Sequence, residues 1–181
     1  MNHKSPILAH LCCAPDALYV VGLLQAEYEV VGLFYNPNIH PEEEYRLRLA
    51  EMRKVADHLK FNLIEDIYDP ETWFGLTEKF KAEPEKGRRC QVCFAWRLDR
   101  TARKARELQI PIFTTIMSVS PWKNAAVLNK IGRLTANKYR LNFLEADFKK
   151  KDGFNRSVRL SREFGLYRQN YCGCLYSRRP G

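Results

Sequence analysis

Apolar runs of strand length alternate along this chain with longer stretches in which apolar residues recur at helical spacing. The runs predict five strands, at residues 7–11, 30–35, 62–65, 111–115 and 142–146. The stretches between them predict helices at residues 17–26, 42–60, 91–108 and 121–137, and a further short helix is expected after about residue 147. Strands that alternate with helices predict an α/β fold, in which helices cover both faces of a mostly parallel sheet.

The alternation continues without an internal repeat, a low-complexity tract or a linker. One domain spanning residues 1–181 is therefore expected, which is long enough for a sizeable core. Ligands of such sheets bind beyond the carboxyl ends of the strands. Residues 12–16 and 118–121 directly follow predicted strands, so both segments are expected at the functional edge.

Basic charge is concentrated in the last third of the chain. The net charge is +9, but residues 1–120 carry 16 basic and 17 acidic side chains, whereas residues 121–181 carry 14 and 4. In a basic tail at about 147–181, basic and aromatic residues are interleaved; among them are Lys149, Lys150, Lys151, Arg168, Tyr171, Arg178 and Arg179. Such a mixture favours RNA, since cations neutralise phosphates and aromatic rings stack on bases; a solvated basic face is the alternative.

The chain lacks the features of an exported or membrane-spanning protein. No run approaches the roughly 20 apolar residues that cross a bilayer, and the first six residues show no secretory signal. We therefore expect a cytoplasmic protein with no membrane partner. In that reducing compartment, paired cysteines are more typical of metal sites or catalytic thiols than of structural disulfides.

Six cysteines stand in three close pairs, Cys12 with Cys13, Cys90 with Cys93 and Cys172 with Cys174. The first pair stands between a predicted strand and a predicted helix. Helix N-terminal amides favour anions and lower the pKa of thiols, and thiolates bind metals. Asp16, in the same segment, is a candidate oxygen ligand or proton donor, or else only a favourable carboxylate in the first helical turn.

The Cys90-Gln-Val-Cys93 pair begins a predicted helix, a placement found in zinc, iron–sulfur and thioredoxin-like redox sites. Together with the first pair it offers four thiolates, which suit either a structural zinc or a cubane iron–sulfur cluster. The spacing does not choose between these metals.

The third pair is separated by a single glycine, so a disulfide within it would close a small, strained and therefore labile ring. Metal ligands and free thiols are the alternatives. Two further residues have structural interpretations: His10 is expected to be a core histidine, and Gly132 is expected to mark close packing of its helix.

Several stretches together resemble one known family. They are residues 10–16 (HLCCAPD), residues 89–93 (RCQVC) with Arg97 and Leu98, residues 114–124, and a long tail that ends at Cys174. Over nearly the whole chain, the sequence resembles the epoxyqueuosine reductases of the QueH family.

The resemblance implies a Rossmann-like fold akin to the PP-loop enzymes, without ATP use because the usual phosphate loop is replaced by residues 12–16. It implies the last step of queuosine synthesis, in which an epoxide on the wobble nucleoside of the tRNAs for Asp, Asn, His and Tyr is reduced to an alkene without cobalamin. A [4Fe–4S] cluster on Cys12, Cys13, Cys90 and Cys93 is implied, with a second iron held by cysteine and Asp16.

The resemblance also implies that Cys172 and Cys174 form a redox-active pair. Removing an epoxide oxygen needs two protons, so Asp16, if it is not a ligand, is expected to supply one in catalysis. Ferredoxin or flavodoxin is the expected electron donor. The residues expected to contact tRNA are Lys123, Lys149, Lys150, Lys151, Arg168, Tyr171 and Arg178. Two other functions fit some of the same residues: a zinc-stabilised RNA-binding module and a metal-free thiol–disulfide oxidoreductase.

Overall fold

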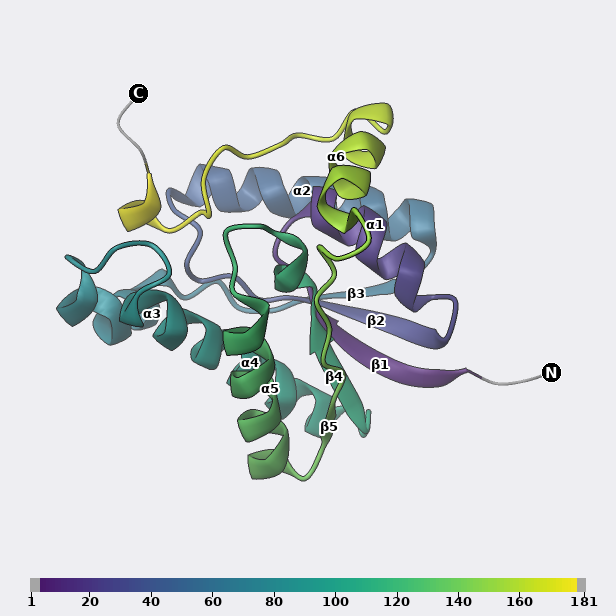
Figure 1. The fold of residues 1–181 in the computed structure, drawn as a ribbon, viewed down its shortest axis with the longest axis horizontal. Coiled ribbons are helices and arrows are strands. Elements are labelled where there is room, and N and C mark those ends of the chain that lie inside the picture. The colour runs from purple at the N-terminus through teal and green to yellow at the C-terminus, as the bar shows by residue number, and fades with distance from the viewer. Residues whose placement is uncertain (1–3, 179–181) are drawn as a thin grey trace.

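Five parallel strands form the centre of the molecule (Figure 1). The computed structural model describes residues 4–178, so Arg179 lies outside the described residues. The strands are β1 (Ser5–His10), β2 (Tyr28–Phe34), β3 (Asn62–Glu65), β4 (Ile112–Thr115) and β5 (Asn142–Phe143). Their order is β3-β2-β1-β4-β5, and every neighbouring pair is parallel. This order is that of the Rossmann type, so the predicted fold class is confirmed.

Helices lie on both faces of the sheet. Figure 1 shows α1 (Ala14–Leu24), α2 (Glu42–Leu59) and α6 (Gly153–Glu163) on one face, and α4 (Arg88–Glu107) and α5 (Ala125–Tyr139) on the other. The short helix α3 (Pro70–Thr77) and three 3-10 turns, Glu78–Phe80, Ile116–Val119 and Leu175–Ser177, complete the described elements.

The central strand β1 is apolar on both sides because it separates two cores. Ile7, which pairs with Val30 of β2, faces the core beneath α1 and α2. The next residue, Leu8, pairs with Phe113 of β4 and faces the core beneath α4. Alternate residues of a strand point to opposite faces, so a continuous apolar run is needed here.

The predicted elements are present with shifted ends. The first helix begins at Ala14, earlier than predicted, because Pro15 fits its first turn. The helix predicted from residue 121 begins at Ala125, where the Asn124 side chain accepts the Val127 amide as an N-cap. The last strand is shorter than predicted. Helix α3 was not predicted, although Asp69 caps it by accepting the Thr72 amide.

The expectation for Gly132 is confirmed. A Cβ atom at this position would lie 2.3 Å from the ring of Phe143, so glycine lets α5 approach β5 closely. Among the described residues, no helix is both long and apolar enough to cross a membrane.

Candidate active site

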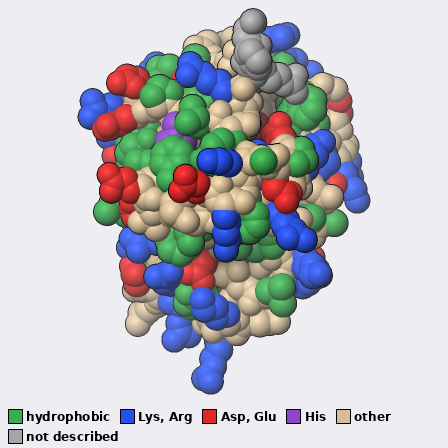
Figure 2. All heavy atoms as spheres, turned by 90° about the vertical axis from the view of Figure 1, so that its left-hand side faces the viewer, with side chains coloured by type: hydrophobic (Ala, Val, Ile, Leu, Met, Phe, Trp, Pro, Cys, Tyr) green, Lys and Arg blue, Asp and Glu red, His purple; other side chains and the backbone are tan. Residues whose placement is uncertain are grey.

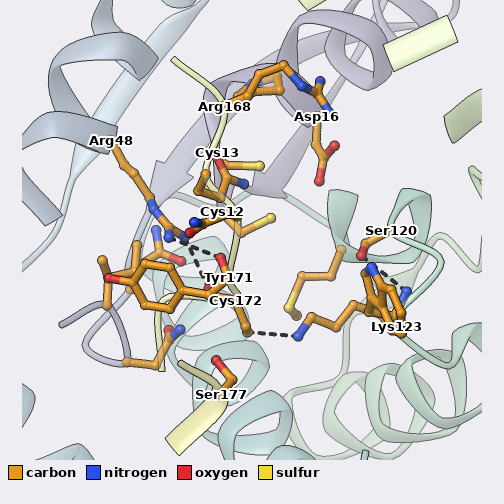
Figure 3. Close-up of a pocket in the computed structure, with 18 of the residues that line it drawn as sticks. Cys12, Cys13, Asp16, Arg48, Ser120, Lys123, Arg168, Tyr171, Cys172 and Ser177 are labelled. Atoms are coloured by element: carbon orange, nitrogen blue, oxygen red, sulfur yellow. Dashed lines mark hydrogen bonds between the residues drawn. The ribbon is translucent and has the colours of Figure 1, made fainter. Parts of the chain in front are cut away.

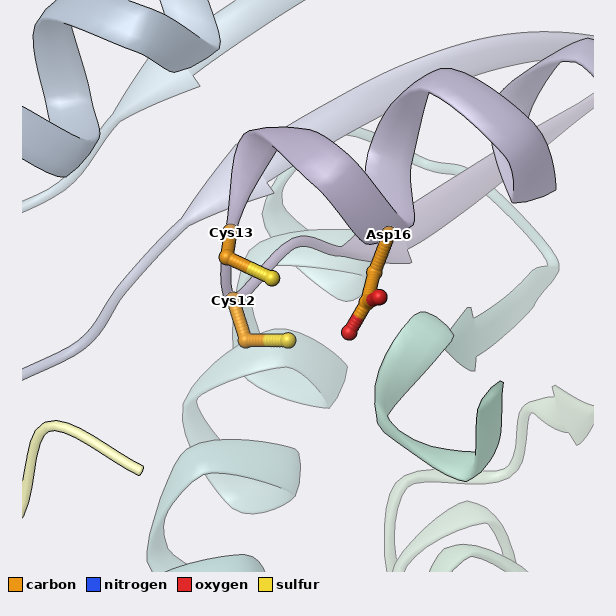
Figure 4. A group of neighbouring side chains, drawn as sticks. All are labelled: Cys12, Cys13 and Asp16. Carbon is orange, nitrogen blue, oxygen red and sulfur yellow. The ribbon is translucent and has the colours of Figure 1, made fainter. Parts of the chain in front are cut away.

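The first cysteine pair lies at the carboxyl end of the central strand. Cys13 is the N-cap residue of α1, and Asp16 is in the first turn of that helix. The two sulfurs and a carboxylate oxygen of Asp16 all lie within 4.8 Å of one another, and the side chains converge (Figure 4). Within residues 4–178, these three are the only such group of cysteine, histidine and carboxylate ligand atoms.

Crowding of acidic groups shapes the electrostatics of this group. The pKa of Cys13 is raised well above its ordinary value by its hydrogen bond with Cys12, by burial and by the charge of Asp16. Burial raises the pKa of Asp16, while hydrogen bonds from Cys13 and Ser157 oppose that shift. A bound cation relieves such crowding, and two thiolates with one carboxylate suit iron or zinc.

Helix α6 holds the carboxylate in place. The Ser157 hydroxyl lies 3.1 Å from Oδ1 of Asp16 and 3.0 Å from the Pro15 carbonyl oxygen. Ser157 and Ser161 are buried, and α6 packs on α1 through them and Gly153. Small residues at a spacing of four allow this close approach.

The second pair lies in the first turns of α4. The Cys90 sulfur accepts a hydrogen bond from the Lys86 amide at 3.3 Å. Cys90 and Cys12 pack against a small buried cluster of Phe94, Met117 and Leu128. Cys93 is buried against Trp73. These two sulfurs are not part of the close group at β1, so a single centre held by both pairs stays a prediction.

The third pair lies in a turn fixed from two sides. Gly173 has φ +105°, a conformation that glycine adopts without strain, and its carbonyl accepts the His40 amide at 2.8 Å. Arg48 of α2 donates to the carbonyl oxygens of Tyr171 and Cys172, both at 3.1 Å. All six cysteines are free thiols in this structure. A disulfide between Cys172 and Cys174 therefore stays a prediction.

A pocket of about 180 Å³ joins the first and third pairs (Figure 3). Cys12, Cys13 and Asp16 lie on one side of it, and Cys172 lies on another. Further lining side chains are Asn38, Arg97, Lys123, Arg168 and Tyr171. The pocket thus brings Cys12, Cys13 and Cys172, which are far apart in the sequence, to one place at the edge of the sheet.

A polar network lies beneath the pocket. The buried Arg97 donates to Oδ1 of Asn36 at 2.6 Å and to Nε2 of His10 at 3.3 Å. Burial and the neighbouring Arg97 charge lower the pKa of His10 well below its ordinary value, so it is neutral at pH 7. His10 is thus the core histidine that the sequence predicted.

The residues expected to contact tRNA divide into two sets. Arg168 and Tyr171 line the pocket, and so does Lys123, whose side chain is buried rather than on the open surface. Lys149 donates to the Ser118 and Lys123 carbonyls, while Lys150, Lys151 and Arg178 are exposed. Over the face in Figure 2, which is the left-hand side of Figure 1, basic side chains are interspersed with acidic and hydrophobic ones.

Sequence reasoning missed Arg48, Asn38 and Ser157. A signal for Arg48 exists, because this charged residue stands on the buried stripe of α2 between Tyr45 and Leu49. A charge on an apolar helix face requires a buried partner. Asn38 and Ser157 carry no comparable signal.

Comparison with known proteins places the chain among its relatives. The family model "Epoxyqueuosine reductase QueH" matches residues 7–180. The chain is 36% identical over 180 residues to an epoxyqueuosine reductase QueH from Streptococcus pyogenes serotype M1, covering 96% of this chain and 71% of that protein. It is 38% identical over 175 residues to one from Thermotoga maritima, covering 94% and 89%.

A solved structure supports the fold alone. It is described as a predicted subunit of a tRNA methyltransferase from Methanocaldococcus jannaschii, with a TM-score of 0.56 and 13% identity. The match covers 87% of this chain and 76% of that one. The family match extends over all three cysteine pairs and the residues that line the pocket. This chain belongs to the QueH family.

Proposed function

We propose that this protein is an epoxyqueuosine reductase. The reaction takes two electrons and two protons, converts the epoxide of the wobble nucleoside to an alkene and releases water. The substrates are the tRNAs for Asp, Asn, His and Tyr. Family membership supports this activity.

The pocket at the carboxyl end of β1 supports the proposal most directly. It is lined by Cys12, Cys13 and Asp16, whose side chains are of the kinds that bind metals, and by Cys172 of the third pair. An epoxide bound there lies between a site for oxygen activation and a thiol that can lose electrons. The pocket is also lined by Arg97 and Arg168, whose positive charges would stabilise a developing alkoxide.

The donor set of Cys12, Cys13 and Asp16 fits a single iron. We further propose a [4Fe–4S] cluster on Cys90 and Cys93 together with Cys12 and Cys13, so the first pair serves one or both centres. When bound, such iron supplies electrons one at a time and a Lewis acid for the epoxide oxygen.

The protein's own residues orient the substrate and move protons. Asp16 has a raised pKa through burial, which suits it to hold a proton for the leaving oxygen. Oδ1 of Asn38 is buried at the pocket and has no hydrogen-bond partner among residues 4–178. It is available to accept a hydrogen bond from a hydroxyl or N–H group of the nucleoside.

The wobble nucleotide must leave the anticodon stack to enter the pocket. Arg168 and Tyr171 are proposed to hold it at the rim, while Lys149, Lys150, Lys151 and Arg178 contact phosphates of the loop. A cytoplasmic ferredoxin or flavodoxin is the proposed electron donor.

Anaerobic purification with iron, sulfide and zinc analysis, followed by turnover on epoxyqueuosine-containing tRNA, tests the function. We expect about four sulfides per chain, iron in excess of sulfide and formation of queuosine. Zinc alone after reconstitution with iron and sulfide, with no turnover, would leave an RNA-binding module instead.

Alanine variants at the two pairs test the ligand assignment. Cys90→Ala is expected to abolish the cluster, seen as loss of sulfide, together with turnover. Asp16→Ala is expected to lose one iron and keep the sulfide. Cys12→Ala distinguishes the centres: loss of sulfide assigns this residue to the cluster, whereas loss of one iron alone assigns it to the single iron.

A further inference from the structure

Lys123 places a buried positive charge against one sulfur of the third pair. Its Nζ lies 2.8 Å from Sγ of Cys172, the contact drawn as a dashed line in Figure 3. The residue is only 9% exposed. Its backbone is fixed by a turn, in which its amide donates to Ser120 and its carbonyl accepts from Lys149.

The two cysteines of the pair have unlike surroundings. Cys172 lines the pocket, whereas Cys174 is buried beside Trp73 and Cys93 and does not line it. Burial raises the pKa of the Cys172 thiol, but the charge and hydrogen bond of Lys123 outweigh this effect and lower that pKa.

Other charged and titratable groups also face Cys172. Arg97 of α4 adds to the effect of Lys123, and Glu85 of the loop before α4 opposes it. Glu85 lies 3.8 Å from Nζ of Lys123, farther than the Cys172 sulfur. Lys123 also interacts with the more distant thiols Cys90 and Cys93, and Tyr171 interacts with Cys172. The closest partner of the ammonium is therefore the Cys172 sulfur.

We propose that Lys123 is a positioning residue that makes Cys172 the reactive sulfur of the pair. Its ammonium holds Cys172 as a thiolate at the pocket wall, and the buried Cys174 then closes the disulfide. The inference rests on the proposed function only in that the epoxide of the substrate is the oxidant of the cysteine pair. Oxidation of the pair breaks the S–H bond of Cys174, forms one S–S bond and gives two electrons and one proton. The epoxide takes up two electrons and two protons in becoming an alkene and water, and the second proton is the one that Cys172 released when it became a thiolate.

Lysine suits this task better than arginine, because an ammonium is a compact charge that fits beside one sulfur in a closed space. The ring of Phe94, whose centroid is 5.6 Å from Nζ, makes a favourable cation–π contact with the same ammonium. The Lys123 amine is buried and contacts Cys172, so the expected contact between Lys123 and a tRNA phosphate stays a prediction.

Alkylation of the protein, purified anaerobically with its metals, tests this inference. Iodoacetamide labels a thiolate by forming a sulfur–carbon bond and releasing iodide. Fragment-ion mass spectrometry of the peptide that contains both cysteines separates Cys172 from Cys174. The variants are Lys123→Met, which removes the charge, and Lys123→Arg, which keeps it. Lys60→Met is the control, because Lys60 precedes β3 and lies at the opposite edge of the sheet.

We expect wild-type Cys172 to be labelled first, with Cys174 at least about tenfold slower at pH 7. Lys123→Met should slow labelling of Cys172 by about tenfold or more and move its pH profile to higher pH. Lys123→Arg should restore most of the rate, and Lys60→Met should match wild type. Circular dichroism of each variant confirms that the fold is intact.

Any of three results would overturn the inference. The first is preferential labelling of Cys174, and the second is equal labelling rates of Cys172 in wild type and Lys123→Met. The third is that Cys172 resists labelling until metal is chelated, which would make it a metal ligand. The labelling needs neither tRNA nor turnover. A protein that labels as expected but does not reduce epoxyqueuosine therefore refutes the proposed function and leaves the role of Lys123 intact.

Discussion

At the scale of single residues, buried cations fix the parts of the site that have no regular structure. The tail after α6 has no helix or strand until Leu175. Arg48 holds it through two carbonyl oxygens, and Tyr171 donates from its hydroxyl to the His40 carbonyl. A planar guanidinium can bridge two acceptors in this way, and an ammonium cannot do so with the same geometry.

Replacing Arg48 should therefore weaken both the fold and the turn. Its side chain is 3% exposed and pairs with Glu44 at 2.7 Å, so Arg48→Met should lower the free energy of unfolding by about 3–5 kcal/mol. Hydrogen exchange should become faster at residues 171–174. Arg48→Lys should keep part of the stability but not the protection of the turn.

Arg46 provides the matched control on the same helix. Its ion pair with Glu42 is exposed on both sides, so Arg46→Met should change the free energy of unfolding by less than about 1 kcal/mol. Chemical denaturation of the three variants makes the comparison. Equal losses in the free energy of unfolding for Arg46→Met and Arg48→Met would show that the buried contacts of Arg48 stabilise the fold no more than the exposed ion pair of Arg46.

The site was predictable at this scale only where its residues are neighbours in sequence. Cys12, Cys13 and Asp16 follow one strand, and the pattern of that strand was sufficient to bring them together. The contact between Lys123 and Cys172 joins residues 49 positions apart. Sequence offered only a positive charge near a basic tail, and a charge count does not reveal which lysine is buried.

At the scale of elements, helix packing depends on where side chains are absent. Gly132 gives room to the Phe143 ring, whereas a Cβ atom at the exposed Gly22 of α1 would meet nothing within 4 Å. The two helical glycines thus differ in their effect on stability. Gly132 is required by packing, whereas Gly22 only weakens its helix.

Alanine at the two positions should have opposite effects. Gly22→Ala should raise the free energy of unfolding by about 0.5–1 kcal/mol through helix propensity. Gly132→Ala should lower it, because overpacking costs about 1–3 kcal/mol and exceeds that gain. Thermal melting of both variants tests this. In a Phe143→Leu background, the cost of Gly132→Ala should shrink; an unchanged cost would exclude the ring as its cause.

The order of strands and helices followed from apolar periodicity, but α3 did not. Its eight residues are too few to show a helical period, and its signals are the local Asp69 cap and Pro70 at the start. Helix ends likewise depend on caps such as Asn124 rather than on periodicity. Short elements held by local hydrogen bonds are therefore the part that hydrophobic pattern cannot predict.

At the scale of the whole molecule, charge and topology act together. The pocket lies at the carboxyl edge of the sheet. The excess of basic over acidic side chains is in residues 121–181, the last part of the chain to pass this edge. Lys150 and Lys151 are exposed there, beside the Lys149 contacts with the pocket wall. Their exposure is compatible with the phosphate contacts proposed for them.

Salt dependence of tRNA binding tests this distribution of charge. The double variant Lys150→Gln/Lys151→Gln should weaken binding and lower the slope of log K against log salt by about 2. Lys4→Gln/Lys60→Gln removes the same charge at the amino edge of the sheet and should leave the slope nearly unchanged. Equal slopes for the two double variants would contradict the proposed phosphate contacts.

The pocket is built from segments at opposite ends of the sequence, and this has a consequence for the order of events during synthesis. The ligand group at β1 is made first, and the turn that carries Cys172 follows all five strands. A ribosome-bound chain can therefore present Cys12, Cys13 and Asp16 to metal before the last wall exists. The iron proposed for this group would then bind before the tail closes over it.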